Sequence, residues 1–319
     1  MSPNRNDQNG FLAINKPIGL TSFKVVEKVK KHLKIKKVGH TGTLDPRASG
    51  VLILALGYAT KTLNFMPDSP KSYEVEMSLG FSSNTEDIEG DIFGAEPEKY
   101  PGIDEFKTVL ESFLGKQKQV PPQFSAIKIS GKPAYKYARA GQVIQIPERE
   151  IEIFSFHNIN LNEGPKVIEV SQKNNPIKKL TFKKYFTFEV SCSKGTYIRS
   201  LVRDIGQRLH IPALLIGLKR TLSDAFYLRD STELNALLVE EKNPDIISIF
   251  DFFQPYLAQF FFPDHFEKVI FNGGFIPATD LDLPVEDEQI FLLKNSRYNL
   301  FAFYKKDGQK LKAMKVIHP

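Results

Sequence analysis

Cysteine is nearly absent from this chain of 319 residues, in which Cys192 supplies the single thiol. One cysteine cannot form a disulfide within the chain or a cysteine-based zinc site, and it suits a reducing compartment. The six histidines also lack the spacing of metal ligands, and they lie at positions 32, 40, 157, 210, 265 and 318. The sequence therefore predicts no bound metal.

Long apolar runs and nucleotide-binding motifs are missing as well. No apolar run reaches the roughly 18 residues of a membrane span, and residues 1–10 lack the apolar centre of a signal peptide. The chain has no Walker-type phosphate loop, no Gly-x-Gly-x-x-Gly after a strand and no His-Glu-x-x-His. We therefore expect a cytoplasmic protein with a disordered leader over residues 1–10, no membrane partner and no cofactor. Any catalysis must come from its own side chains.

The composition favours a folded protein with an affinity for polyanions. Hydrophobic residues make up 41% of the chain and aromatic residues 12%, which is enough for a sizeable core. The 43 basic residues outnumber the 37 acidic ones, and a net charge of +6 attracts phosphates. Many basic proteins bind no nucleic acid, so charge alone does not assign RNA binding. The length fits one large domain and a small one.

A lysine-rich helix is expected near the N-terminus. Phe11–Ile14 has the pattern of a short strand, and Thr21 or Ser22 caps a helix that runs to about His32. Its outer face and the segment after it carry lysines at positions 24, 28, 30, 31, 34, 36 and 37. Such a run is usually a solvated helix face. The alternative is a stripe that faces phosphates.

Strand and turn patterns continue along the rest of the chain. Strands are expected at 51–56 and 72–80, followed by a polar, turn-rich stretch at 82–94 and a short helix at 106–113. Several strands are expected at 151–190, with a polar break at 172–179. A turn followed by a helix is expected at 193–209. After about residue 245 the sequence pattern changes, with clustered phenylalanines followed by short strand-like runs. We place a second, smaller domain over residues 246–319.

The densest group of special residues lies between Gly39 and Gly50. Glycines allow unusual backbone torsions, and Pro46 keeps Asp45 out of the helical region, so Asp45 sits in a pre-set turn before a strand. A carboxylate held in this way can act as a nucleophile or general base. Leu-Asp-Pro is also a common turn sequence, so a purely structural role for Asp45 stays open.

Two further segments have residue types that suit RNA chemistry. Arg199 has the planar fork that pairs with a buried carboxylate and keeps it ionised, although a surface ion pair is the alternative. Residues 120–141 interleave tyrosines with lysine and arginine, which suits base stacking and phosphate contact. The alternative for that segment is an amphipathic loop and helix on the surface.

Several motifs in the right order make residues 11 to about 230 resemble the TruB family of tRNA pseudouridine synthases. The segment 39–52 (GHTGTLDPRASGVL) is similar to the catalytic-loop motif of the family, and Lys71-Ser72-Tyr73 matches the position of its active-site tyrosine. The remaining motifs lie at 15–17, 120–128, 131–139, 192–201 and 218–221. Together they are far more specific than any one of them.

The resemblance implies an α+β fold with the pseudouridine synthase catalytic domain over residues 11–245. That domain is expected to have a mixed, largely antiparallel sheet, a central cleft with Asp45 at its floor, and an RNA-gripping insertion at about 120–150. Residues 246–319 are then a small, mostly β domain, interpreted as a divergent PUA-like domain. They match the PUA type poorly, and the acidic run at 280–288 repels phosphates locally.

The resemblance also implies the reaction. A uridine in the T-loop of tRNA, at position 55, is flipped out of its stack and isomerised to pseudouridine without a cofactor. Asp45 is implied as the nucleophile, Arg199 as its ion-pair partner, and Tyr73 as the ring that stacks on the uracil.

Four more residues receive roles from the resemblance. His40 is implied to fill the gap that the flipped base leaves in the RNA, and a satisfied core histidine is the alternative. Lys16, Tyr197 and Leu218 are implied to shape and close the pocket, and a structural lysine beside a turn is the alternative for Lys16. Asp224 stands where members of the family often have glycine, and we expect this departure to touch only a turn beyond the catalytic core.

Other functions remain open at this stage. The chain is alternatively a pseudouridine synthase for another RNA, including a guide-dependent one, or a non-catalytic tRNA-binding or tRNA-folding protein. The 120–141 segment favours a stand-alone enzyme that grips the T-arm of tRNA without a guide RNA. A monomer is the default expectation. The residues at positions 45, 73 and 199 favour catalysis. A DNA-binding regulator is disfavoured because no recognition-helix motif is present.

Overall fold

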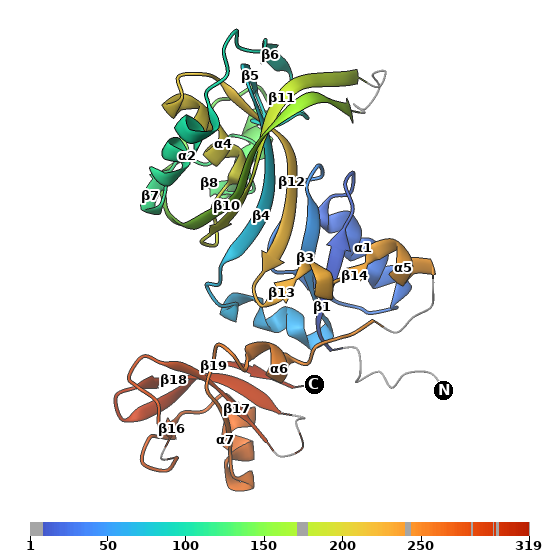
Figure 1. Cartoon of the computed structure of the whole chain (residues 1–319). Coiled ribbons are helices and arrows are strands. Elements are labelled where there is room, and N and C mark those ends of the chain that lie inside the picture. The colour runs from blue at the N-terminus through green and yellow to red at the C-terminus, as the bar shows by residue number, and fades with distance from the viewer. Residues whose placement is uncertain are drawn as a thin grey trace.

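The computed structural model describes residues 9–170, 178–239, 244–281, 283–295, 297 and 300–318. The protein has a large sheet with helices and a smaller sheet below it (Figure 1). This arrangement confirms the predicted α+β class with a small, mostly β C-terminal part. Most of the expected leader lies outside the described residues, and Gly10 already begins a strand.

Ten strands of the described residues form the large sheet, which is mixed and mostly antiparallel. The main order is β14-β1-β3-β12-β4-β11-β10-β7, with β2 paired to β3 and β13 paired to β12. The strands are β1 (Gly10–Lys16), β2 (Val38–His40), β3 (Ser49–Leu56), β4 (Lys71–Leu79), β7 (Gly115–Gln119), β10 (Arg149–Val170), β11 (Lys178–Cys192), β12 (Ala213–Ser223), β13 (Phe226–Tyr227) and β14 (Thr232–Glu233). Strand β12 comes from a distant part of the sequence and lies between β3 and β4, which follow one another along the chain.

Four helices, among them the short α5 (Leu234–Val239), share a hydrophobic core with one face of this sheet. Helix α1 (Ser22–His32) packs beside β1 and β3, whereas α2 (Ile103–Glu111) and α4 (Ile198–Arg208) pack beside β4, β10 and β11. In α1, the Thr21 hydroxyl accepts from the backbone N–H of Lys24, and Val25 and Val29 are buried. Helix α1 therefore has the limits and the apolar face that the sequence predicted.

The inner strands β1 and β3 are buried on both faces. Leu12 and Leu52 point into the core with α1, while Phe11 and Val51 point into a second core on the other side. Burial on both faces explains why residues 51–56 are a continuous apolar run without polar alternation. The second core is completed by phenylalanines from the C-terminal part, and the Phe252 ring stacks on Phe11 at 3.9 Å.

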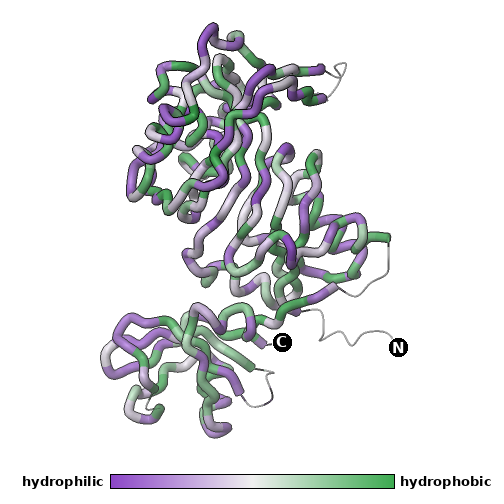
Figure 2. The backbone as a smooth tube through the Cα atoms, in the orientation of Figure 1, coloured by the Kyte–Doolittle hydropathy of each residue, from purple (hydrophilic) through white to green (hydrophobic). Residues whose placement is uncertain are grey.

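The C-terminal part thus packs against the second face of β1 and β3, at one end of the large sheet. In the described residues it contains the five-stranded sheet β15-β17-β18-β19-β16. Its elements are α6 (Ile249–Phe253), β15 (Gln259–Phe261), α7 (Glu267–Phe271), β16 (Ile276–Pro277), β17 (Ile290–Lys294), β18 (Phe301–Asp307) and β19 (Lys310–Ile317). Figure 2 shows hydrophobic stretches in both sheets next to hydrophilic ones, as expected for strands that cover a core.

Some segments differ from the sequence-based expectation. Residues 151–190 form two long strands rather than several, because register shifts bend β10 and β11 without ending their pairing. The polar break predicted there falls mostly on residues 171–177, outside the described residues. The predicted 106–113 helix begins earlier, at Ile103, after the N-cap Gly102. The turn-rich 82–94 stretch contains the short pair β5 (Phe81–Ser83) and β6 (Ile92–Gly94).

The remaining short elements are β8 (Lys128–Ile129), β9 (Lys132–Pro133) and α3 (Ala134–Ala138). Three 3-10 helices, Gly57–Phe65, Leu228–Asp230 and Asp264–Phe266, complete the described fold. Strands β8 and β9 pair as a hairpin within the predicted insertion. Among the described residues, no helix combines the length and apolar character needed to cross a membrane.

Candidate active site

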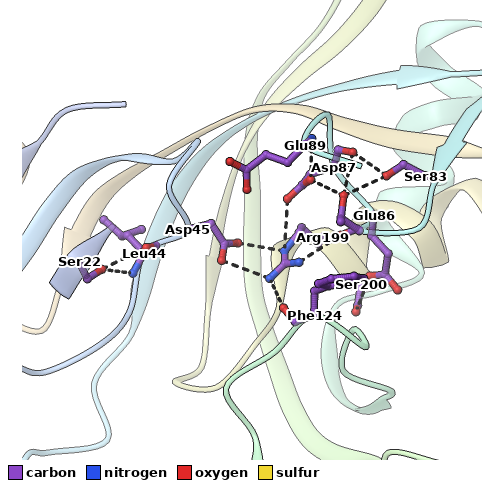
Figure 3. Close-up of polar contacts among 11 residues, drawn as sticks. Ser22, Leu44, Asp45, Ser83, Glu86, Asp87, Glu89, Phe124, Arg199 and Ser200 are labelled. Atoms are coloured by element: carbon purple, nitrogen blue, oxygen red, sulfur yellow. Dashed lines mark hydrogen bonds and ion pairs between the residues drawn. The ribbon is translucent and has the colours of Figure 1, made fainter. Parts of the chain in front are cut away.

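Asp45 lies in the loop between β2 and β3, and this loop is tied down on several sides. The Ser22 hydroxyl bonds both backbone groups of Leu44, with its Oγ 2.9 Å from the amide N and 3.1 Å from the carbonyl O (Figure 3). Gly50 closes the loop at φ +105°, and a Cβ there would lie 2.2 Å from the carbonyl O of Arg220. Glycine is therefore required where the loop enters β3.

Arg199, at the start of α4, grips the carboxylate of Asp45 from the other side of the cleft. Its Nε lies 2.9 Å from Oδ2 of Asp45, and its Nη2 lies 3.2 Å from Oδ1. The same guanidinium donates to the carbonyl oxygens of Thr85 and Phe124, both at 3.0 Å (Figure 3). The bidentate contact fixes both the position and the orientation of the Asp45 carboxylate.

The buried carboxylate of Asp87 and the half-buried carboxylate of Glu86 lie near this pair, and neither was predicted from the sequence. Asp87 Oδ2 lies 3.9 Å from Arg199 Nε, and Glu86 accepts from Arg203 at 2.6 Å and from Ser200 at 3.0 Å. Burial raises the pKa of both carboxyls, while the nearby arginines oppose the shift. The adjacent acids in the turn-rich 82–94 segment were the available signal, but nothing in the sequence indicated that this turn reaches Arg199.

A cavity of about 260 Å³ opens beside Asp45. Of the residues predicted for the site, Asp45, Tyr73, Tyr197, Arg199 and Leu218 line it. The remaining lining residues are Thr41, Gly42, Thr43, Leu44, Lys71, Phe124, Ser125, Ala126, Lys194, Gly195, Thr196, Ile198 and Arg220. The structure therefore brings together residues from five separate sequence motifs around one small chamber.

Tyr73 contributes a buried ring to this cavity. Its exposed fraction is 7%, and burial raises the pKa of its phenol to about 12. The phenol is therefore neutral in the ordinary pH range. A neutral aromatic ring in a small pocket offers a stacking surface for a planar base.

Two cations that the sequence analysis did not select lie beneath the loop. Arg220, on β12, is almost fully buried and donates from Nε to the carbonyl of Val51 at 2.7 Å and from Nη2 to that of Gly42 at 3.3 Å. Lys71, on β4, is buried beside it, and burial together with the charge of Arg220 lowers the pKa of its ammonium to about 8. Both cations line the cavity and give it a positive floor.

Asp224 lies close to the cavity, although the sequence comparison with the family placed it in a turn beyond the catalytic core. Its carboxylate accepts from the Ser69 hydroxyl at 2.6 Å and from the Thr41 hydroxyl of the Asp45 loop at 3.4 Å. It also attracts Lys71, raising the pKa of that ammonium against the effect of burial. Its φ of +54° explains why glycine suits this position. The expectation that Asp224 touches only a distant turn is therefore wrong.

Replacing Asp224 with asparagine tests this coupling. Loss of the negative charge should lower the pKa of Lys71 below about 8, so Lys71 becomes neutral at a lower pH than in the wild type. If the Lys71 cation helps to hold RNA, the alkaline fall of kcat/KM moves to lower pH. The pH–rate profile measures this shift, and Asp224→Gly removes the charge while suiting the positive φ. Unchanged profiles in both variants would show that the charge of Asp224 does not affect activity through the Lys71 cation.

Two predicted site residues do not line the cavity. Lys16 is fully buried, and its ammonium donates to the carbonyls of Leu20 at 2.7 Å, Pro17 at 3.0 Å and Pro46 at 3.4 Å. It holds the Asp45 loop from behind. His40, on β2, is half-buried, and its pKa is lowered by burial and then by Arg220 and Lys71. Its Nδ1 is buried without a hydrogen-bond partner among the described residues.

The predicted insertion forms part of the cavity wall. Phe124, Ser125 and Ala126 line the cavity, and Gln119 bonds the backbone of Tyr197 at 2.9 Å and 3.1 Å. Farther along, Arg139 lies 5.2 Å from the centre of the Tyr135 ring. The described residues contain no group of three or more His, Cys, Asp or Glu side chains arranged to hold a metal ion.

Known proteins are similar to this one in sequence and in fold. The sequence model of the TruB family pseudouridylate synthase (N terminal domain) matches residues 30–198. A protein of Alkaliphilus oremlandii called tRNA pseudouridine synthase B is 35% identical over 312 residues, which is 97% of each chain. One of the same name from Bacillus velezensis is 43% identical over 221 residues, covering 69% of this chain and 67% of the relative.

Solved structures extend the likeness to the whole fold. A Cbf5–Nop10–Gar1 complex contains a chain that aligns with a TM-score of 0.67 and 23% identity, covering 98% of this chain and 86% of that one. An H/ACA RNP bound to a substrate RNA containing 2′-deoxyuridine aligns with a TM-score of 0.63 and 22% identity, with the same coverage. At such low identity these alignments establish the fold alone.

Proposed function

Because the chain belongs to the TruB family of pseudouridylate synthases, we propose that it isomerises uridine to pseudouridine at position 55, in the T-loop of tRNA, with Asp45 as the nucleophile. The observation that carries the proposal is the bidentate contact between Asp45 and Arg199 at the mouth of a base-sized cavity. The relatives named tRNA pseudouridine synthase B support tRNA as the substrate.

The chemistry follows from the position of the carboxylate. The target uridine leaves its stack and enters the cavity, which costs a few kcal/mol that binding contacts offset. An Asp45 oxygen attacks C1′ of the ribose, or assists a glycal route, and the bond between C1′ and N1 breaks. The detached uracil turns until C5 faces C1′. A new bond joins these two carbons as the bond between Asp45 and C1′ breaks or, in the glycal route, as the proton removed from C2′ returns. The C5 proton is then lost, and N1 gains a proton.

The other lining residues hold the base during this turn. Tyr73 stacks on the uracil, and the raised pKa of its phenol supports a stacking role more than a role as general base. Leu218 and Tyr197 close the cavity around the base. Arg199 holds the Asp45 carboxylate at the cavity in a fixed orientation through its bidentate contact.

Two residues act outside the cavity in this proposal. His40 fills the gap that the flipped nucleotide leaves in the RNA, for which its lowered pKa provides a neutral ring. Lys16 supports the Asp45 loop through the Pro46 carbonyl. Residues 120–150 grip the T-arm, no guide RNA is required, and the protein works as a monomer.

Mapping the product in an unmodified tRNA transcript tests the proposed position. Wild-type protein alone should convert the uridine at position 55 and no other T-loop uridine. A transcript with cytidine at that position is the matched control and should yield no pseudouridine in the T-loop. Conversion elsewhere, with position 55 untouched, would show that the enzyme acts on a different site.

A further inference from the structure

The positive charge of this protein is concentrated in one short segment. Residues 24–37 contain seven lysines and one acid, Glu27, which gives a net charge of +6. The whole chain also has a net charge of +6, so all other residues together are neutral. The seven lysines are all exposed, and they are Lys24, Lys28, Lys30, Lys31, Lys34, Lys36 and Lys37.

Several other surface lysines of the protein face carboxylates. Lys107 lies opposite Asp104, Lys179 opposite Glu169 and Lys184 opposite Glu163. None of the seven forms an ion pair with the part of the chain that the structure describes. Their charges are therefore available to a ligand.

Helix stability does not explain the pattern. Lys24 lies in the first turn of α1, where the helix dipole favours an acid, and that turn contains no acid. Lys24 and Lys28 are four residues apart, a spacing at which like charges destabilise a helix. Lys31 extends the same face into the last turn, where the helix dipole favours a cation. The placement of Lys24 and Lys28 costs helix stability, and such a surface is expected where a ligand is bound.

Helix α1 is anchored directly to the catalytic loop. Its first residue, Ser22, bonds Leu44, the neighbour of Asp45 (Figure 3). Just before the helix, the Gly19 amide donates to the Pro46 carbonyl at 2.8 Å. The helix of 11 residues extends for roughly 16 Å from this anchor, since each residue adds about 1.5 Å. The lysine surface thus begins at the loop that carries Asp45 and leads away from it.

Helix α1 and the insertion lie on opposite sides of the cavity. The cavity lies between the Asp45 loop, to which α1 is attached, and a wall that includes residues 124–126. Figure 1 shows α1 on the opposite side of β4 and β12 from β8, which belongs to the insertion. The exposed ring of Phe23 lies beside Lys24 and offers a stacking surface among the cations.

We propose that Lys24, Lys28 and Lys31 bind the phosphate backbone of the substrate tRNA on the side of the cavity opposite the insertion. The surface and the insertion then hold the RNA from two sides while the target base enters the cavity. The inference rests on the proposed function for the identity of the RNA. It adds a binding surface outside the cavity, where none of these side chains touches a reacting atom.

Changing the three lysines to glutamine tests the surface, because glutamine is a good helix former without charge. Each lost phosphate contact lowers the slope of log Kd against log salt concentration by about one. The slope for the triple variant should therefore be lower than that of wild type by about three. Its Kd for a tRNA transcript at fixed salt should rise on the order of tenfold or more. The single-turnover rate at saturating enzyme should stay within about twofold of wild type, because the cavity is unchanged.

Two matched variants complete the experiment. Replacing Lys107, Lys179 and Lys184 with glutamine removes the same charge from paired lysines and should change the slope by less than about one. Replacing Lys24, Lys28 and Lys31 with arginine should retain wild-type affinity. Equal slopes for the two glutamine variants would overturn the inference. Absence of uridine turnover in wild type would instead overturn the proposed function, whatever the slopes.

Discussion

Replacing Asp45 with asparagine should lower the single-turnover rate of pseudouridine formation by at least about 10⁴-fold, as removal of a nucleophile does in other enzymes. Asparagine keeps the shape of the side chain but lacks the negative charge that attacks C1′. The Kd for tRNA should change little, because the Asp45 side chain is a small part of the protein surface that contacts the RNA. Nucleoside analysis of the product and filter binding measure the two quantities separately.

Asp87→Asn provides the matched control for that variant. It removes a second carboxylate that faces the same guanidinium, at 3.9 Å from Arg199 Nε, but Asp87 does not line the cavity. Its rate should fall by far less than that of Asp45→Asn. Equal losses in the two variants, or retained turnover in Asp45→Asn, would exclude Asp45 as the nucleophile.

Replacing Arg199 with lysine is expected to reduce the rate by about 10²-fold or more, since small displacements of a reacting group have effects of this size. Lysine keeps the charge but loses the fork that bonds both oxygens of Asp45 and the carbonyls of Thr85 and Phe124. The carboxylate then loses its fixed orientation. The Kd for tRNA should remain within a few-fold of wild type, so the loss appears in kcat.

Arg203→Lys tests whether this loss is specific. Arg203 lies one turn along α4 and pairs with Glu86 at 2.6 Å without contacting Asp45. Its replacement should leave the rate within about threefold of wild type because the Asp45 carboxylate keeps its partner. A near-normal rate in Arg199→Lys would show that the bidentate contact does not support catalysis.

Local sequence patterns predicted much of the fold. The cap at Thr21 and the apolar spacing of α1 are local features, and the structure has that helix at the predicted limits. The continuous apolar run at 51–56 correctly indicated a strand, although only the packing of the C-terminal phenylalanines shows why both of its faces are apolar. Turns, register shifts and partner strands depend on distant contacts, so the long strands β10 and β11 were not predicted individually.

Site residues within contiguous sequence motifs were predicted. Residues that reach the site only through distant contacts were missed. The motifs containing Asp45, Tyr73 and Arg199 were selected from the sequence, and the structure brings all three side chains to one cavity. Arg220 and Asp87 were not selected, because strand pairing and a loop approach place them there. The roles of all these residues in catalysis remain predictions that the variants above examine.

Tritium release from a T-arm RNA hairpin, labelled at C5 of the uridine corresponding to position 55, tests the central claim most directly. The C5 proton is lost only when the uracil is detached and rejoined through C5. Wild-type protein, with no other RNA or protein added, is predicted to release the label and leave pseudouridine in the hairpin. A hairpin that binds tightly but releases no tritium would contradict the claim and favour a protein that binds or folds tRNA without modifying it.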